Sequence, residues 1–203
     1  ILSKSFFGFA EHMLRIYRTD NSIAGITADY KISSNLTSTY GLIPFPLIWG
    51  WATWKRAWEG YSFYLNEYKN NAIPEFIASL PNKQQRYWNY NFNKICNSNK
   101  PHTWDFQFSY LVLSRNQSFI HPFTNLVSNI GFSSDATHTK NPFDKFSHLK
   151  IGNIIEPYVY DSDSKIYSDY LSSEVFIHRS FLNKIIQKIK YLIVYSWRNI
   201  FKG

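Results

Sequence analysis

The residue best suited to chemistry is Asp105, in the stretch T-W-D-F-Q at residues 103–107. The sequence predicts that a helix begins at Thr103 or Asp105 and ends near Asn116. A carboxylate at a helix start is exposed and is oriented by the helix dipole, which suits a general base that must reach a substrate proton. The residues alone favour the simpler alternative, an aspartate that only caps the helix.

Four of the seven tryptophans lie in the stretch I-W-G-W-A-T-W-K-R-A-W, residues 48–58. Trp51, Trp54 and Trp58 are spaced at i, i+3 and i+7, so a helix starting near Trp51 would place them on one face. Because indole rings are largely buried on average, core packing is the favoured interpretation for Trp54 and Trp58.

The first two tryptophans of this stretch flank a predicted corner. Trp49 ends the apolar run 42–48, which predicts a strand, and the helix is expected to follow at Trp51. Gly50 between them allows a tight strand-to-helix corner that a side chain would obstruct. Aromatic rings can cover the apolar face of a sugar while polar groups bind its hydroxyls. For Trp49 and Trp51 a binding role and core packing are weighed equally.

A third stretch, N-L-V-S-N-I-G-F-S-S-D-A-T-H-T, spans residues 125–139. It predicts a strand up to Gly131, followed by a loop that could close over a ligand and bring His138 to a phosphate or a metal. A lone surface histidine is more often inert, and no H-x-x-x-H spacing supports a metal site. The phosphate-binding glycine loop and the G-x-S-x-G motif are also missing, so P-loop and serine hydrolases lack support.

The elements that must position these residues alternate between helix and strand. We expect a helix from Ser3 or Ser5 to about Arg18, a strand at 22–27, helices between 61 and 99, and strands at 118–121 and 125–130. Such alternation indicates an α/β layer arrangement. The first helix is expected to bury one stripe, made of Phe6, Phe7, Phe9, Ala10, Met13, Leu14 and Tyr17.

Composition limits the class of protein. With 203 residues, 44% hydrophobic and 19% aromatic, the chain can build one sizeable core and is not disordered over most of its length. One cysteine, Cys96, excludes an internal disulfide framework and a cysteine zinc site. The net charge of +8 is compatible with nucleic acid, anionic membrane or phosphorylated ligands, and charge does not choose among them.

The three stretches, in their order along the chain (48–58, 103–107 and 125–139), resemble a group of bacterial glycosyltransferase-like proteins. The N-terminal halves of that group are similar to family 2 glycosyltransferases, and the layout loosely resembles eukaryotic N-acetylglucosaminyltransferases that act on mannose. The resemblance covers roughly residues 1–145. It implies the C-terminal, acceptor-side portion of a GT-A (Rossmann-like) nucleotide-diphospho-sugar transferase fold, of α/β class, followed by a helical tail.

The resemblance also assigns roles to residues. Asp105 stands where the family's general base would deprotonate the acceptor hydroxyl in an inverting transfer. Trp49, Gly50 and Trp51 match the corner that would line donor sugar and acceptor, and Trp104 joins them as substrate-binding. A loop that closes on the nucleotide in related folds corresponds to the loop that contains His138, which is therefore also counted as substrate-binding.

The family binds its nucleotide through a divalent metal, Mn²⁺ or Mg²⁺, held by an acidic E-D-D motif. In the family that motif precedes a helix like the S-x-S-F-F segment found here, so we expect the metal and diphosphate contacts upstream of Ile1. The chain begins without an initiator methionine and is expected to be part of a longer protein. Without its metal-binding half it is expected not to transfer sugar.

We divide the chain into three parts. Residues 1–145 form the C-terminal part of a GT-A domain, residues 146–175 an irregular extension, and residues 176–203 a basic amphipathic helical tail. Apolar residues recur at helical spacing in the tail, and no acidic residue occurs after Glu174. Such a helix suits the surface of an anionic membrane, and docking on the protein's own core is the alternative. No run of eighteen apolar residues occurs.

Taken together, these features predict a glycosyltransferase that moves a sugar from a nucleotide-diphospho-sugar to a glycan or glycolipid acceptor. We expect it to serve bacterial surface polysaccharide or lipopolysaccharide synthesis at the cytoplasmic face of the membrane. A non-catalytic carbohydrate-binding module is the alternative, and an acidic metal motif just before Ile1 would distinguish the two. A nucleic-acid binder ranks last, because the tryptophan stretch contains only two basic residues, Lys55 and Arg56.

Overall fold

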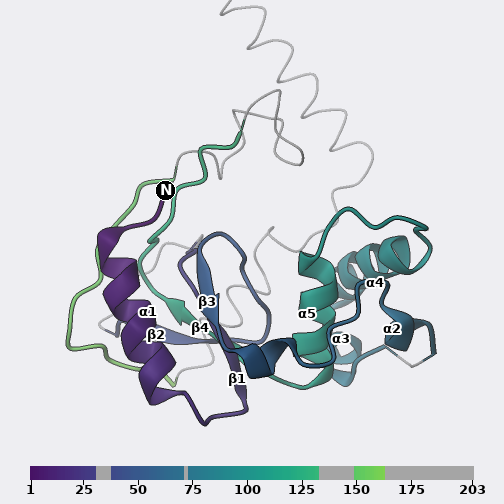
Figure 1. The fold of residues 1–203 in the computed structure, drawn as a ribbon, viewed down its shortest axis with the longest axis horizontal. Coiled ribbons are helices and arrows are strands. Elements are labelled where there is room, and N and C mark those ends of the chain that lie inside the picture. The colour runs from purple at the N-terminus through teal and green to yellow at the C-terminus, as the bar shows by residue number, and fades with distance from the viewer. Residues whose placement is uncertain (31–37, 71–72, 133–148, 163–203) are drawn as a thin grey trace, which may run out of the picture.

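A four-stranded mixed sheet forms the centre of the protein (Figure 1). The computed structural model describes residues 1–30, 38–70, 73–132 and 149–162. The strand order is β2-β4-β1-β3, with β1 parallel to β4, and with β2 and β3 antiparallel to their neighbours. The strands are β1 (Ile23–Thr27), β2 (Tyr40–Ile43), β3 (Trp51–Thr53) and β4 (Ser118–Pro122).

Helices lie on both sides of this sheet, in agreement with the expected α/β class. Figure 1 shows α1 on one side and the group α2 to α5 on the other. Two separate clusters of buried side chains correspond to the two sides. The helices are α1 (Lys4–Ile16), the 3₁₀ helix η1 (Lys55–Trp58), α2 (Asn66–Asn70), α3 (Glu75–Ser79), α4 (Asn82–Cys96) and α5 (Asp105–Ser114).

Helix α1 confirms the predicted amphipathic stripe with one exception. Its buried side chains pack with Ile23 and Ile26 of β1, and Leu14 and Tyr17 lie partly buried at the margin. Phe7 was expected in the stripe but is 63% exposed, because it projects from the flank of the buried stripe toward solvent. The buried members of the stripe are Phe6, Phe9, Ala10 and Met13.

Arg56 of η1 connects helix α1 to the sheet. Its guanidinium donates to the carbonyl oxygen of Tyr17, at 3.1 Å, and to that of Ile23, at 2.8 Å. The same guanidinium lies 4.3 Å from the ring centre of Trp54, in a cation–π contact. One side chain therefore holds the end of α1, the start of β1 and the residue that precedes η1.

The second side of the sheet is covered by α4 and α5. The buried face of α4 includes Trp88, Phe92 and Ile95. Phe108 of α5 reaches the sheet, where its ring centre lies 6.1 Å from that of Phe119 in β4. The helix predicted to begin at Thr103 or Asp105 is confirmed as α5.

The predicted strand at 42–48 is wrong in its bounds. The strand present, β2, covers Tyr40–Ile43 and stops before Pro44. Pro44 and Pro46 lack the backbone N–H that a strand ladder needs, so pairing cannot continue through them.

The predicted helix starting at Trp51 is also wrong, because these residues form strand β3. Trp51 pairs with Thr27 of β1, and the hydroxyl of Thr53 donates to the carbonyl oxygen of Ala24 at 2.5 Å. Pairing with β1 satisfies backbone groups on both strands, which outweighs the helix-like spacing of the tryptophans.

The predicted strand at 125–130 is reduced to one isolated bridge between Leu2 and Val127. The flanking residue Leu126 donates its N–H to the carbonyl of Ala28 and accepts the N–H of Ser3 through its own carbonyl, both at 2.8 Å. Because neighbouring backbone groups bind different segments, no continuous ladder forms there.

Residues 149–162 run past α1 and along the edge of β2 without forming a helix. The Oγ of Ser3 donates to Asn153, and the N–H of Ile154 donates to Ser5. Further along, the N–H of Tyr40 donates to the carbonyl of Val159 at 3.3 Å. The described part of the expected extension therefore packs on the sheet domain, and the tail at 176–203 lies outside the described residues. Within the described residues, no helix has both the length and the apolar character needed to cross a membrane.

Candidate functional site

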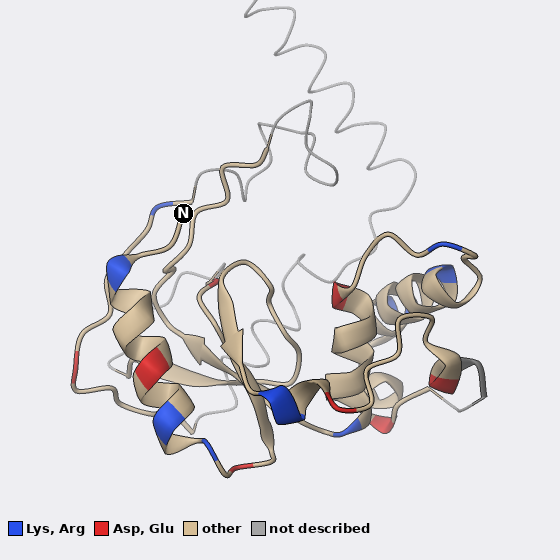
Figure 2. Cartoon of the chain, viewed as in Figure 1, with Lys and Arg blue, Asp and Glu red and all other residues tan. Residues whose placement is uncertain are grey.

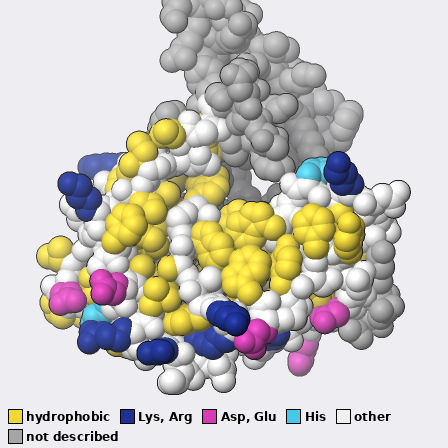
Figure 3. All heavy atoms as spheres, in the orientation of Figure 1, with side chains coloured by type: hydrophobic (Ala, Val, Ile, Leu, Met, Phe, Trp, Pro, Cys, Tyr) yellow, Lys and Arg dark blue, Asp and Glu magenta, His cyan; other side chains and the backbone are white. Residues whose placement is uncertain are grey.

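A cluster of aromatic rings lies between strand β3 and the start of helix α5. Trp51 of β3 stacks on Trp104, with ring centres 5.2 Å apart and planes 26° from parallel. Trp58 lies 5.8 Å from both rings, and Tyr61 lies 5.1 Å from Trp58. We call these four partly buried residues the aromatic cluster. Figure 3 shows hydrophobic side chains reaching the surface over this part of the molecule.

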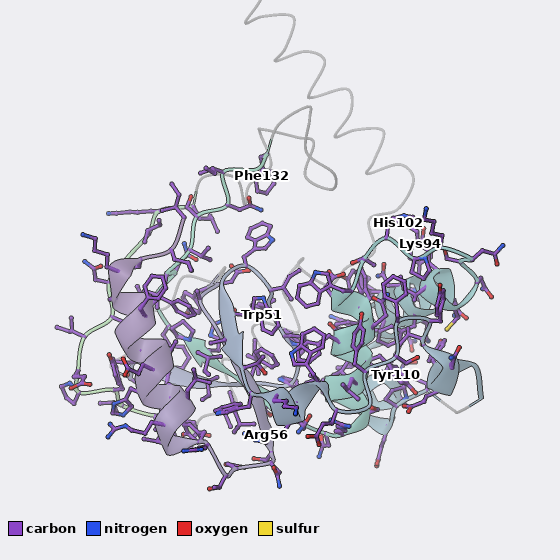
Figure 4. The ribbon with its side chains drawn as sticks, viewed as in Figure 1. Trp51, Arg56, Lys94, His102, Tyr110 and Phe132 are labelled. Atoms are coloured by element: carbon purple, nitrogen blue, oxygen red, sulfur yellow. The ribbon has the colours of Figure 1, made fainter. Side chains whose placement is uncertain are left out.

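Helix α5 packs against the aromatic cluster through Phe108. The ring of Phe108, which is fully buried, stacks on Trp58 with centres 4.3 Å apart and an interplanar angle of 17°. In Figure 4, Trp51 lies between the strands and α5. The tryptophans are therefore packed on the core and still partly exposed to solvent, an arrangement compatible with binding a flat, partly apolar ligand.

The strand geometry divides the tryptophans of the 48–58 stretch between the two sides of the sheet. Trp51 joins the aromatic cluster, whereas Trp54 packs on the α1 side and donates its Nε1–H to the carbonyl of Leu14 at 3.2 Å. Successive strand residues point to opposite faces, so a spacing of three separates these two rings. The expectation that Trp51, Trp54 and Trp58 share one face is therefore wrong for Trp54.

Gly50 forms the expected corner, although it leads from a loop into a strand. Its φ is +68°, and an added Cβ would lie 2.3 Å from Cδ2 of Leu2 and 3.0 Å from Cβ of Ala28. Its carbonyl accepts the N–H of Ala28 at 2.7 Å. Trp49, just before the corner, contacts Phe132 on the α1 side, with ring centres 5.6 Å apart. The structure thus separates Trp49 from Trp51 and connects it with the third sequence stretch.

Substituting Gly50 with alanine is expected to lower the free energy of unfolding by about 1–3 kcal/mol. The positive φ and the contact with Leu2 both oppose a Cβ at this position. Gly8→Ala is the matched control, since a Cβ there meets only the hydroxyl of Tyr158 at 4.0 Å. That helical change should stabilise by roughly 0.5–1 kcal/mol. Urea unfolding of both variants measures the effects, and equal stability of the two would contradict the role given to Gly50.

Asp105 is the first residue of α5, and Trp104 occupies the N-cap position before it. The side chain of Asp105 is partly buried, and it accepts a hydrogen bond from the hydroxyl of Thr103. The hydroxyl of Tyr61 donates to the carbonyl of Trp104 at 3.3 Å. The carboxylate therefore lies beside the aromatic cluster, at a helix start held by neighbouring side chains. It is not in the cap position that the simpler interpretation required.

Two phenols near Asp105 stay protonated at neutral pH. Burial raises the pKa of Tyr61 above its ordinary value, and the charge of Asp105 raises it further. The pKa of Tyr87 is raised by the same two causes, burial first. A neutral phenol does not act as a base. Of Tyr61, Tyr87 and Asp105, the carboxylate of Asp105 is therefore the group suited to accept a proton.

Gln107 is a further residue of the site, although the sequence stretch T-W-D-F-Q gave it no role. Its side chain is fully buried and donates to the carbonyls of Thr103, at 2.5 Å, and Phe63, at 3.0 Å. It ties the loop after η1 to the loop before α5. Only the folded chain brings these two loops together, so no signal in the sequence could have identified this role.

His138 lies outside the described residues, and so does the loop that was expected to close over a ligand. The described part of the third stretch is organised by Asn125. Its Nδ2 donates to the carbonyls of Val127 and Lys150, at 2.7 and 2.9 Å, and its Oδ1 accepts the N–H of Tyr30. The side chain thus joins the segments that follow the parallel strands β1 and β4 to the segment at Lys150.

No set of metal ligands is found in the part of the chain that the structure describes, where no three His, Cys, Asp or Glu residues gather closely enough. The four strands carry no charged side chain (Figure 2). The described residues therefore do not fit the divalent metal that the resemblance implies. No family model, curated protein or solved structure matches this chain.

Proposed function

We propose that this chain is the acceptor-side part of a glycosyltransferase of the GT-A type. It transfers a sugar from a nucleotide-diphospho-sugar to a hydroxyl of a glycan or glycolipid in bacterial surface polysaccharide or lipopolysaccharide synthesis. The observation that carries the proposal is the stacked pair of Trp51 and Trp104 directly beside the carboxylate of Asp105. Aromatic rings suited to a sugar face and a carboxylate suited to accept a proton lie together, on elements far apart in the sequence.

In the proposed reaction, the oxygen of an acceptor hydroxyl attacks the anomeric carbon of the donor sugar. Asp105 accepts the proton of that hydroxyl during the attack. A new glycosidic bond forms, and the bond to the diphosphate breaks with its electron pair on the leaving oxygen. The aromatic cluster holds the apolar face of the sugar and keeps water from the attacking oxygen. The hydroxyl of Thr103 orients the carboxylate by donating to it.

The departing diphosphate carries negative charge, which a divalent metal neutralises in enzymes of this class. The part of the chain that the structure describes holds no ligand set for such a metal, and the metal and nucleotide contacts are proposed from the family resemblance alone. The role of Asp105 in accepting the proton is independent of where the metal binds.

A non-catalytic carbohydrate-binding module is the second candidate, and the aromatic cluster by itself would support it. The two functions differ in what they require of Asp105. A binding module needs only the rings, whereas the enzyme needs a carboxylate that can accept a proton. Turnover by the full-length protein, with and without that carboxylate, is the experiment that tests the proposed function.

We also propose that the tail anchors the protein at the cytoplasmic face of the membrane. Lys and Arg alternate there with Trp, Phe and Ile, and each basic residue near an anionic surface adds about 1 kcal/mol of attraction. Full-length protein should sediment with anionic vesicles, less so in added salt, and a protein shortened to end at Glu174 should not. Equal sedimentation of both proteins would show that the tail packs on the protein instead.

A further inference from the structure

Two exposed aromatic side chains lie on the loop that follows Tyr61 of the aromatic cluster, and neither belongs to the hydrophobic clusters formed by the described residues. Phe63 is 40% exposed and Tyr64 is 47% exposed, on the loop between η1 and α2. Their ring centres are 5.3 Å apart, and their planes are nearly perpendicular, at 86°. Exposing two large rings side by side is unfavourable in water, and paired exposed rings often mark a binding surface.

The backbone holds these rings outward. The next residue, Leu65, has a φ of +50° although it is not glycine, and its side chain is 1% exposed. Backbone strain in a bulky residue with positive φ costs on the order of 1–3 kcal/mol of stability, and residues strained in this way are concentrated at functional sites. The turn at Leu65 places its own side chain in the core and leaves Phe63 and Tyr64 on the surface.

The pair is connected to the start of α5 by direct hydrogen bonds. The buried amide of Gln107 donates both to the carbonyl of Phe63 and to the carbonyl of Thr103. The hydroxyl of Tyr61 donates to the carbonyl of Trp104. The loop that carries the exposed pair and the helix start that carries Asp105 are therefore fixed to each other.

The chemistry of the loop indicates an uncharged ligand. Residues 61–66, Y-S-F-Y-L-N, contain no Lys or Arg, and Glu67 follows. Nucleic acid and anionic lipid both require basic side chains, which this loop does not offer. Aromatic rings with a phenol hydroxyl and an amide, from Tyr64 and Asn66, suit the apolar faces and hydroxyls of a saccharide. Figure 3 shows hydrophobic side chains that continue from over η1 and α5 toward the α2–α4 helices.

We propose that Phe63 and Tyr64 form an outer sugar subsite, so that the protein binds an oligosaccharide of two or more units and not a single sugar. The inference rests on the proposed function, because the inner unit would lie on the aromatic cluster beside Asp105. The outer units would contact Phe63 and Tyr64 and add affinity without touching the reacting hydroxyl.

The test measures the affinity of full-length protein for glucose, mannose and N-acetylglucosamine oligomers of one to six units, by titration calorimetry. In at least one series, the wild type should bind the longer oligomers at least tenfold more tightly than the single sugar. Phe63→Ala/Tyr64→Ala should lower affinity for the long oligomers by roughly tenfold and leave that for the single sugar unchanged. Phe7→Ala, which removes an exposed ring from α1, is the control and should change neither.

A wild-type affinity that does not depend on oligomer length would overturn the proposal. So would a double variant that binds long oligomers as tightly as the wild type. A wild type that binds none of the three sugar series would also overturn it. Loss of anionic-vesicle binding in the double variant, with oligosaccharide binding intact, would assign the pair to the membrane and also overturn it. Failure of the proposed function looks different, because a protein that binds long oligomers through this pair but never transfers sugar would refute only the reaction.

Discussion

Replacing Asp105 with asparagine in the full-length protein is expected to lower the rate of sugar transfer by about a hundredfold or more. Asparagine has the same shape and keeps an oxygen that can accept the hydroxyl of Thr103. It cannot take the proton of the acceptor hydroxyl. The change therefore removes the proposed base while it preserves the local hydrogen bond, so the fold and the affinity for saccharides should remain near those of the wild type.

Transfer is measured as nucleoside diphosphate released in the presence of acceptor, and the fold by thermal unfolding. Asp20→Asn is the matched control, because Asp20 lies in an exposed loop where it accepts hydrogen bonds from the N–H and hydroxyl of Ser22. Its variant should transfer sugar at the wild-type rate. If the Asp105 variant turns over at a near-normal rate, the general base lies elsewhere and the carboxylate only stabilises the helix start.

The second large effect is expected from Trp51, the centre of the aromatic cluster. Trp51→Ala should reduce saccharide affinity by more than tenfold, because it removes the partly exposed ring that stacks on Trp104. It should also destabilise the protein by roughly 3 kcal/mol, as expected when a large core-contacting ring is removed. Trp51→Phe keeps part of the ring and should have intermediate effects on both quantities.

Trp54→Ala separates the loss of binding from the loss of stability. Trp54 lies three residues away on the α1 side, where it donates to the carbonyl of Leu14 and lies beneath the guanidinium of Arg56. Its removal should cost a similar amount of stability, about 3 kcal/mol, and leave saccharide affinity unchanged. Intrinsic fluorescence titrations and urea unfolding give the two quantities. Equal losses of affinity in both alanine variants would mean that the aromatic cluster acts only as core.

The parts of the fold that were predictable depend on short-range patterns. The buried face of α4 follows from apolar residues at helical spacing, and α5 begins where its polar loop ends. Strand β1, which is buried on both faces, was recognisable as a short apolar run between polar residues. In each case the local preference and the tertiary environment favour the same structure, so the sequence alone was sufficient.

The errors occur where long-range pairing or a single side chain outweighs local spacing. The tryptophan stretch has helical spacing, but Trp51 to Thr53 bind the edge of β1, and alternation then places Trp54 on the other side. The proline residues after β2 were visible in the sequence and should have shortened the predicted strand. Phe7 was assigned to the core on spacing, but it is 63% exposed and meets the core only at its margin, where its ring centre lies 6.1 Å from that of Phe6.

The sequence by itself determined that Asp105 begins a helix, that Gly50 occupies a corner, and that the chain folds as alternating helices and strands. The helix start, the glycine at the corner and the alternation depend on neighbours a few residues away, whereas the corner is closed to other side chains by Leu2 and Ala28, which the fold brings there. Only the tertiary structure decided that Trp51 lies against Trp104, that Trp49 lies instead against Phe132, and that Gln107 links two distant loops. Such contacts join residues 44 to 83 positions apart, and they depend on how the strands pair and how the helices pack, which no local spacing records.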